Sequence, residues 1–87
     1  MPRDTDLLEA VGRLLEHRPG WGYEPSPTPG ATPSWCYHER GHIVLSVSVA
    51  QGTICAYLPD GDLEVQFPDV DALMAWVSLA GWTMLLP

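Results

Sequence analysis

Apolar and polar residues alternate with a period of two between Ser34 and Phe67, as in β-strands that bury one face. Three short turn signals interrupt this alternation, namely Arg40-Gly41, Gln51-Gly52 and Asp60-Gly61. A polar residue followed by glycine is typical of the two-residue loop of a β-hairpin. The pattern therefore predicts a four-stranded antiparallel meander over residues 34–67.

The three loops also predict a register, because each loop determines which residues of its two strands face each other. In this register Cys36 pairs with Leu45, Leu45 with Leu58, and Leu58 with Leu63. The residues predicted to line the buried face are Cys36, His38, Leu45, Val47, Val49, Ile54, Ala56, Leu58, Leu63, Val65 and Phe67. The residues predicted on the opposite face are Trp35, Tyr37, His42, Val44, Ser46, Ser48, Cys55, Tyr57, Glu64 and Gln66.

Helical periodicity appears on both sides of the predicted sheet. The spacing of leucine and valine predicts an amphipathic helix over residues 6–18, with Asp4, Thr5 and Asp6 competing for its N-cap. A second helix is predicted over residues 70–80, with Asp69 as its N-cap. We expect both helices to cover the apolar face, which gives an α+β fold with the order α-β-β-β-β-α.

The length of 87 residues predicts one small globular domain over residues 1–87. Residues 19–34 contain five of the nine prolines and are expected to form a stiff crossover between the first helix and the sheet. Whether this crossover covers the outer sheet face or leaves it open is not decided by the sequence. The apolar segment 82–87 is expected to pack under the helices or against a sheet edge.

The charge distribution is one-sided. All four basic residues lie at or before Arg40, and the rest of the chain carries only acids: Asp60, Asp62, Glu64, Asp69 and Asp71. A net charge of −7 repels nucleic acid and anionic membranes, so it favours a basic protein surface as the partner. Residues 1–20 contain four acids and do not predict a secretion signal, and the uncharged stretch 72–87 is too short to cross a bilayer, so a cytoplasmic location is expected.

Candidate chemistry is sparse. Cys36 and His38 are predicted on one face and His42 on the other, so they predict no metal site. The Asp60–Glu64 segment lacks the spacing of a calcium-binding loop. Ser46, Ser48 and Cys55 have no general base within reach in the predicted sheet. The sequence therefore predicts no catalytic residues, no cofactor and no enzymatic activity.

Two surfaces remain for a partner. The predicted partner-binding surface joins aromatic residues of the outer sheet face to acids at one hairpin end, and comprises Trp35, Tyr37, Tyr57, Asp60, Asp62, Glu64 and Gln66. The second helix is apolar almost all round, which suggests a homodimer face formed by Ala72, Ala75, Trp76 and Leu79.

From these features we expect a small acidic protein-binding module, of the inhibitor or immunity type, whose partner is another protein with a basic or nucleic-acid-binding surface. In size and charge alone it is similar to small acidic proteins of phages and mobile elements that inhibit host or CRISPR nucleases. The alternative hypothesis is a dimeric chaperone or adaptor that binds a peptide on its open sheet face. A small hydrolase or ligand-binding domain is the third hypothesis.

Overall fold

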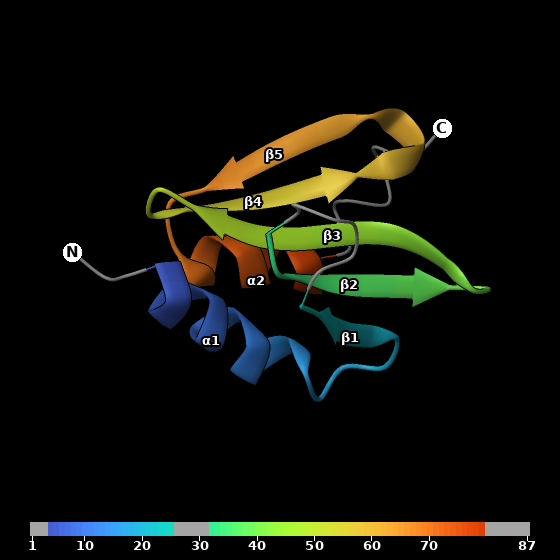
Figure 1. The fold of residues 1–87 in the computed structure, drawn as a ribbon, viewed down its shortest axis with the longest axis horizontal. Helices are drawn as coiled ribbons and strands as arrows, with labels where there is room; N and C mark the ends of the chain where they lie inside the picture. The colour runs from blue at the N-terminus through green and yellow to red at the C-terminus, as the bar shows by residue number, and fades with distance from the viewer. Residues whose placement is uncertain (1–3, 26–31, 80–87) are drawn as a thin grey trace.

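A five-stranded antiparallel sheet forms the centre of the molecule, with its strands in the order of the sequence. The structure is a computed structural model and describes residues 4–25 and 32–79. Its elements are α1 (Asp4–Leu15), β1 (Trp21–Glu24), β2 (Ser34–Glu39), β3 (His42–Ala50), β4 (Thr53–Leu58), the 3₁₀ turn η1 (Pro59–Gly61), β5 (Leu63–Phe67) and α2 (Val70–Ser78). Figure 1 shows the sequential strands, with α2 behind β3. The α+β class and the antiparallel meander are confirmed.

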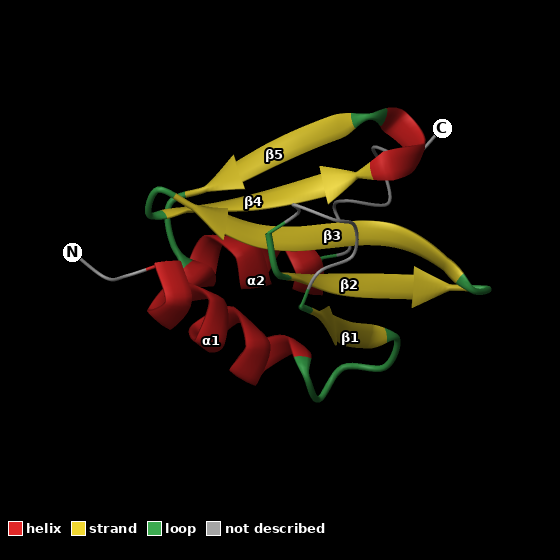
Figure 2. Ribbon diagram, viewed as in Figure 1, coloured by secondary structure: helices red, strands yellow, loops and turns green. Residues whose placement is uncertain are grey.

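The sheet has one strand more than the sequence predicted. β1 lies within the proline-rich crossover and pairs with β2 along its whole length, from Trp21 opposite Tyr37 to Glu24 opposite Ser34 (Figure 2). The prediction of a purely connecting segment was therefore wrong for residues 21–24. The short run Trp21-Gly22-Tyr23 puts both aromatic rings on one face, where each contacts a ring of β2.

The predicted register is confirmed for the last three strands. Val49 pairs with Ile54 and Ala56 with Val65, as the apolar alternation required. Both Arg40-Gly41 and Gln51-Gly52 have positive φ at each residue, which is the geometry of a type I′ hairpin turn. The third connection is the 3₁₀ turn with Asp62 in the left-handed region, and the register survives because Leu58 still pairs with Leu63.

The predicted register is correct where Glu39 pairs with His42 but wrong for the part of β2 up to Tyr37. A bulge lies where Tyr37 pairs with Leu45 but His38 pairs with Ile43, so β3 has one extra residue at that point. Trp35 then lies opposite Val47 on the helix-covered face, and Cys36 lies opposite Ser46 on the other face. The physical reason is size, because packing the large rings of Trp35 and Tyr37 against the core under the helices removes far more apolar surface from water than packing Cys36 and His38 there would.

Both helices pack against the same face of the sheet. The buried cluster that joins them to the strands comprises Val11, Leu15, Val44, Leu45, Val47, Val49, Ile54, Ala56, Leu58, Phe67, Leu73 and Val77. At the ends of the helices, Arg18 donates a hydrogen bond of 3.1 Å to Oγ of Ser78. Asp69 caps α2 as predicted, because its Oδ1 accepts a hydrogen bond of 2.8 Å from the backbone N–H of Ala72. Residues 80–87 lie outside the described residues, so the predicted packing of segment 82–87 stays a prediction.

The first residue of α1 also holds the loop between β3 and β4. The Asp4 carboxylate accepts hydrogen bonds from the backbone N–H of Gln51 at 3.0 Å and of Gly52 at 2.7 Å. These two donors have no partner within a type I′ turn that points into solvent. Asp4 thus links the start of α1 to a loop 47 residues further along the chain.

Candidate protein-interaction surfaces

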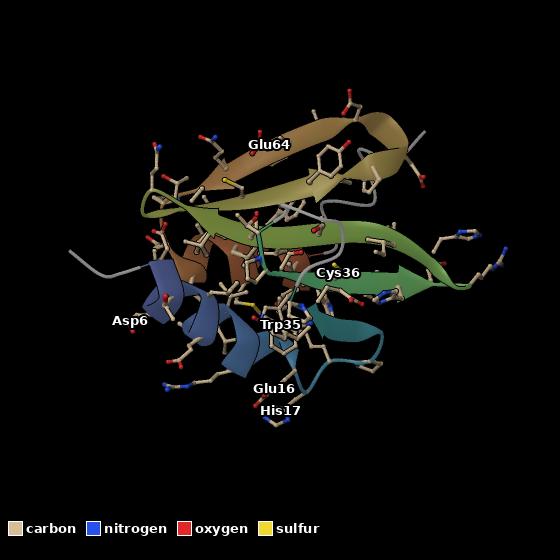
Figure 3. The ribbon with its side chains drawn as sticks, viewed as in Figure 1. Asp6, Glu16, His17, Trp35, Cys36 and Glu64 are labelled. Carbon is tan, nitrogen blue, oxygen red and sulfur yellow. The ribbon has the colours of Figure 1, made fainter. Side chains whose placement is uncertain are left out.

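The structure divides the predicted partner-binding surface between two faces. Trp35 and Tyr37 pack against the core on the helix-covered side, so their assignment to the outer face was wrong. The other predicted residues stay together at the β4–β5 hairpin, which we call the acidic hairpin end: Tyr57, Asp60, Asp62, Glu64 and Gln66. Figure 3 shows the separation, with Trp35 near α1 and Glu64 on β5.

Within the acidic hairpin end, Tyr57 is held by its neighbours. Its hydroxyl donates a hydrogen bond of 2.8 Å to Oδ1 of Asp62, and its ring lies opposite Glu64 in the strand pair. Asp62 reaches this position because it adopts the left-handed conformation after the 3₁₀ turn, with φ of 49°. The Tyr57 ring nevertheless remains 40% exposed. The result is an accessible aromatic ring held by the Asp62 carboxylate, with Glu64 at the paired position of β5.

The charges at this hairpin are only partly compensated. Asp60 lines a shallow hollow of about 610 Å³ together with Arg40 and His42 of the β2–β3 hairpin. Among the residues that the structure describes, no basic side chain forms an ion pair with Asp60, Asp62 or Glu64. Asp62 and Glu64 do not line this hollow, so neither carboxylate has a contacting cation among the described residues.

Asp62 affects the ionisation of Tyr57. The hydrogen bond from the phenol to the carboxylate, with smaller contributions from desolvation and from the negative charge of Asp62, raises the pKa of Tyr57 above its ordinary value of 10.0. Cys55 lies on the same face, and burial, followed by the neighbouring Glu64, raises its pKa as well. Both groups are therefore neutral near pH 7, and Cys55 is not an activated thiolate.

We expect Asp62→Asn to lower the pKa of Tyr57 towards its ordinary value, since the substitution removes the charge but tolerates the left-handed backbone. A raised pKa means that Asp62 stabilises the fold while the phenol is protonated and that this contribution disappears as the pH rises through the folded-state pKa. Ultraviolet titration of phenolate absorbance measures the shift, and Tyr57→Phe identifies the transition that belongs to Tyr57. An unchanged titration in Asp62→Asn would contradict the effect of the charged carboxylate on the pKa of Tyr57.

The outer sheet face is accessible only in part. Ser34 and Cys36 are 3% and 1% exposed although α1 and α2 both lie on the other side of the sheet. Their side chains lie 3.7 Å apart, and the Cys36 thiol lies 3.8 Å from the hydroxyl of Ser46. The exposed part of this face is the β4–β5 half, where Tyr57, Glu64 and Gln66 lie.

The predicted dimer face is also divided. Ala72 and Trp76 are half-buried and pack against the core, and the Trp76 ring lies 5.1 Å from the ring of Phe67. Ala75 and Leu79 are exposed, Leu79 to 82%. Trp76 thus contributes to the fold of the single chain, and homodimerisation stays a prediction.

The groups considered for metal binding and catalysis are arranged differently from the prediction. Cys36 and His38 face away from the helices, and Nε2 of His38 lies 3.6 Å from the carboxylate of Glu24 on β1. No cluster of three or more His, Cys, Asp or Glu side chains suited to a metal ion occurs in the described part of the chain. In the same residues, no helix combines the length and apolar character needed to cross a membrane.

A second surface was not predicted. Between α1 and the β1–β2 edge runs a groove of about 410 Å³, which we call the aromatic groove and which is lined by Thr5, Leu8, Glu9, Gly12, Arg13, Glu16, Tyr23 and Trp35. The Trp35 and Tyr23 rings form its wall, with centroids 5.4 Å apart and planes tilted by 50°. The alternation of Trp21, Gly22 and Tyr23 was the sequence signal that could have indicated it, because it places Tyr23 on an edge strand.

Comparison with known proteins gives no match to any family model. No curated protein and no solved structure matches the chain either.

Proposed function

We propose that this chain is a small non-enzymatic protein-binding module that contacts a basic surface of another protein through the acidic hairpin end. The observation that carries the proposal is the exposed Tyr57 ring, fixed by its 2.8 Å hydrogen bond to Asp62 and lying opposite Glu64. Tyrosine is one of the residues enriched in the energetically important centres of protein interfaces.

Fixing the ring before binding supports this proposal on energetic grounds. A side chain that is already ordered loses less conformational entropy when a partner arrives, and this cost is about 0.5–1.5 kcal/mol for a mobile side chain at an interface. The uncompensated carboxylates of Asp62 and Glu64 then attract a basic surface and accelerate its association at low ionic strength. Tyr57 provides contact area, while the carboxylates provide charge selectivity.

The partner class follows from the same charges. Basic protein surfaces are typical of proteins that bind nucleic acid, so an inhibitor or immunity-type role against such a protein is the most specific form of the proposal. We place this interaction in the cytoplasm, where Cys36 and Cys55 would remain the free thiols that the structure contains. The buried Ser34 and Cys36 leave no continuous open sheet face for a peptide, so we do not favour the chaperone alternative.

The test compares two variants with the same change in net charge. The hairpin variant, Asp60→Lys with Glu64→Lys, reverses two charges of the acidic hairpin end but keeps Asp62 and Tyr57. The helix variant, Asp6→Lys with Asp71→Lys, reverses the charges of one exposed residue on each helix. A partner captured from the native cells by the wild-type protein is identified and its affinity for each variant is measured by calorimetry. We expect the hairpin variant to bind at least about tenfold more weakly at low salt and the helix variant to bind nearly as well as wild type.

The salt dependence completes this experiment. The wild-type affinity should fall as the ionic strength rises, and the difference between wild type and hairpin variant should shrink with it. Equal affinity of the hairpin variant and the wild type would refute the proposed binding surface. Circular dichroism of both variants ensures that a loss of binding is not a loss of fold.

A further inference from the structure

The aromatic groove depends on a glycine in the middle of α1. At Gly12 a Cβ atom would lie 2.7 Å from Cζ2 of Trp35 and 2.9 Å from its Nε1. Only a residue without a side chain lets the indole edge approach the helix backbone so closely. Glycine in a helix costs about 1 kcal/mol relative to alanine, and at this position it allows the Trp35 ring to pack directly against the backbone of α1.

The indole group presents an unused hydrogen-bond donor. Trp35 Nε1–H has no acceptor among the described residues. Every buried side-chain nitrogen or oxygen of these residues has a partner, so the unpaired Trp35 Nε1 is not buried. This donor is therefore reached from the groove. A Trp N–H that is not buried donates to water, and a ligand carbonyl in the groove can take the place of that water as its acceptor.

The groove also has a defined length and charge. Its lining residues on α1 run from Thr5 to Glu16, which corresponds to about 16 Å of helix at about 1.5 Å per residue. Arg13 lies 4.0 Å from Glu9, so these two charges largely cancel. Glu16 then gives one end of the groove a net negative charge. Among the described residues its carboxylate pairs with no Arg side chain, only with the imidazole of His17, whose Nε2 lies 3.3 Å from Oε1 of Glu16.

We propose that the aromatic groove binds an extended, proline-rich segment of a partner protein that carries one basic residue. Polyproline II segments dock in grooves lined by aromatic rings, lose little entropy on binding and expose carbonyl oxygens that a Trp N–H can reach. At about 3.1 Å per residue, the groove accommodates about five residues of such a segment. Tyr23 and Trp35 contact the prolines, the indole N–H binds a carbonyl, and Glu16 pairs with the basic residue.

This site lies on the helix-covered side of the sheet, away from the acidic hairpin end, and does not rest on the function proposed above. Tyr57 and Glu64 belong to the opposite face of β4 and β5. Reversing the charges of Asp60 and Glu64 should therefore leave binding at the groove unchanged, so each proposal can fail without the other.

The experiment uses the full chain labelled with ¹⁵N and the peptide acetyl-Arg-Pro-Leu-Pro-Pro-Leu-Pro-amide as probe. The indole N–H signal of Trp35, assigned with Trp35→Phe, should shift during the titration, while that of Trp76 should stay in place. Tyr23→Ala removes an exposed ring at the groove and should weaken binding about tenfold or more. Glu16→Gln should weaken it about threefold, as expected for an exposed ion pair.

Two control peptides distinguish the parts of the recognition. The peptide with alanine in place of every proline and the peptide with glutamate in place of arginine should both bind more weakly than the probe. Equal binding of the alanine peptide would overturn the polyproline assignment, and equal binding of the glutamate peptide would overturn the role of Glu16. No shift of the Trp35 signal at millimolar probe would overturn the site itself.

Discussion

Replacing Leu45 with aspartate is expected to abolish cooperative folding. Leu45 is completely buried in the middle of β3, and its side chain is part of the cluster that joins the sheet to both helices. A carboxylate at this position has no basic partner and must either lose its hydration or take up a proton, at a cost of at least about 4 kcal/mol. For a domain of this size that loss approaches the whole free energy of folding.

Two variants control for this result. Ser48→Asp places the same charge on the opposite face of the same strand, where Ser48 pairs with Cys55 and is half-buried, and it should retain a folded state. Leu45→Met conserves volume and polarity and should cost less than about 1.5 kcal/mol. Thermal melts followed by circular dichroism measure all three. A cooperative, native-like melt of Leu45→Asp would show that Leu45 does not face the core.

Replacing Gly20 with alanine is expected to destabilise the fold by about 2–5 kcal/mol. Gly20 has φ of +87°, a conformation that costs an alanine about 1–2 kcal/mol. Its Cβ would also lie 2.8 Å from Cε1 of Tyr37 and 3.2 Å from the backbone oxygen of His38, which adds about 1–3 kcal/mol of overpacking. The Gly20 carbonyl accepts a 2.8 Å hydrogen bond from the His38 N–H, so the backbone cannot move away without breaking that bond.

Gly41→Ala separates the two contributions. Gly41 has φ of +81°, almost the same as Gly20, but a Cβ there meets no atom within 4 Å. It should therefore show the conformational cost alone, about 1–2 kcal/mol. Chemical denaturation of the two variants gives the difference, which we expect to be about 1–3 kcal/mol. Equal destabilisation would mean that Tyr37 does not pack against Gly20.

The sequence was sufficient to predict β3, β4 and β5 because their apolar residues alternate strictly and their loops agree. It was insufficient for β2, where Val44 and Leu45 are both apolar and a bulge shifts the register without disturbing the pattern. The competing signal was the size of Trp35 and Tyr37, which favours their placement on the helix-covered face more strongly than the alternation favours that of Cys36. β1 was missed because its three alternating residues lie among prolines.

The candidate surfaces were predictable to different degrees. The acidic hairpin end was found from charge and register, because Tyr57, Glu64 and Gln66 belong to strands whose pairing was correct. The hydrogen bond from Tyr57 to Asp62 could not be predicted from the sequence, because it depends on the left-handed backbone conformation of Asp62. The aromatic groove could not be predicted, because it requires the contact between Gly12 of α1 and Trp35 of β2. A contact between residues so far apart in the sequence does not affect the local pattern of apolar residues.

The link from Asp4 to the β3–β4 loop makes two distant parts of the chain open together. In an isolated hairpin the amide protons of Gln51 and Gly52 would exchange with solvent almost freely. Here they are held by a carboxylate that belongs to the first turn of α1, so they become available only when that turn separates from the loop. Fraying of the helix start and loosening of the loop are thus one event, and the rate at which these two amides exchange measures how often α1 detaches at its beginning.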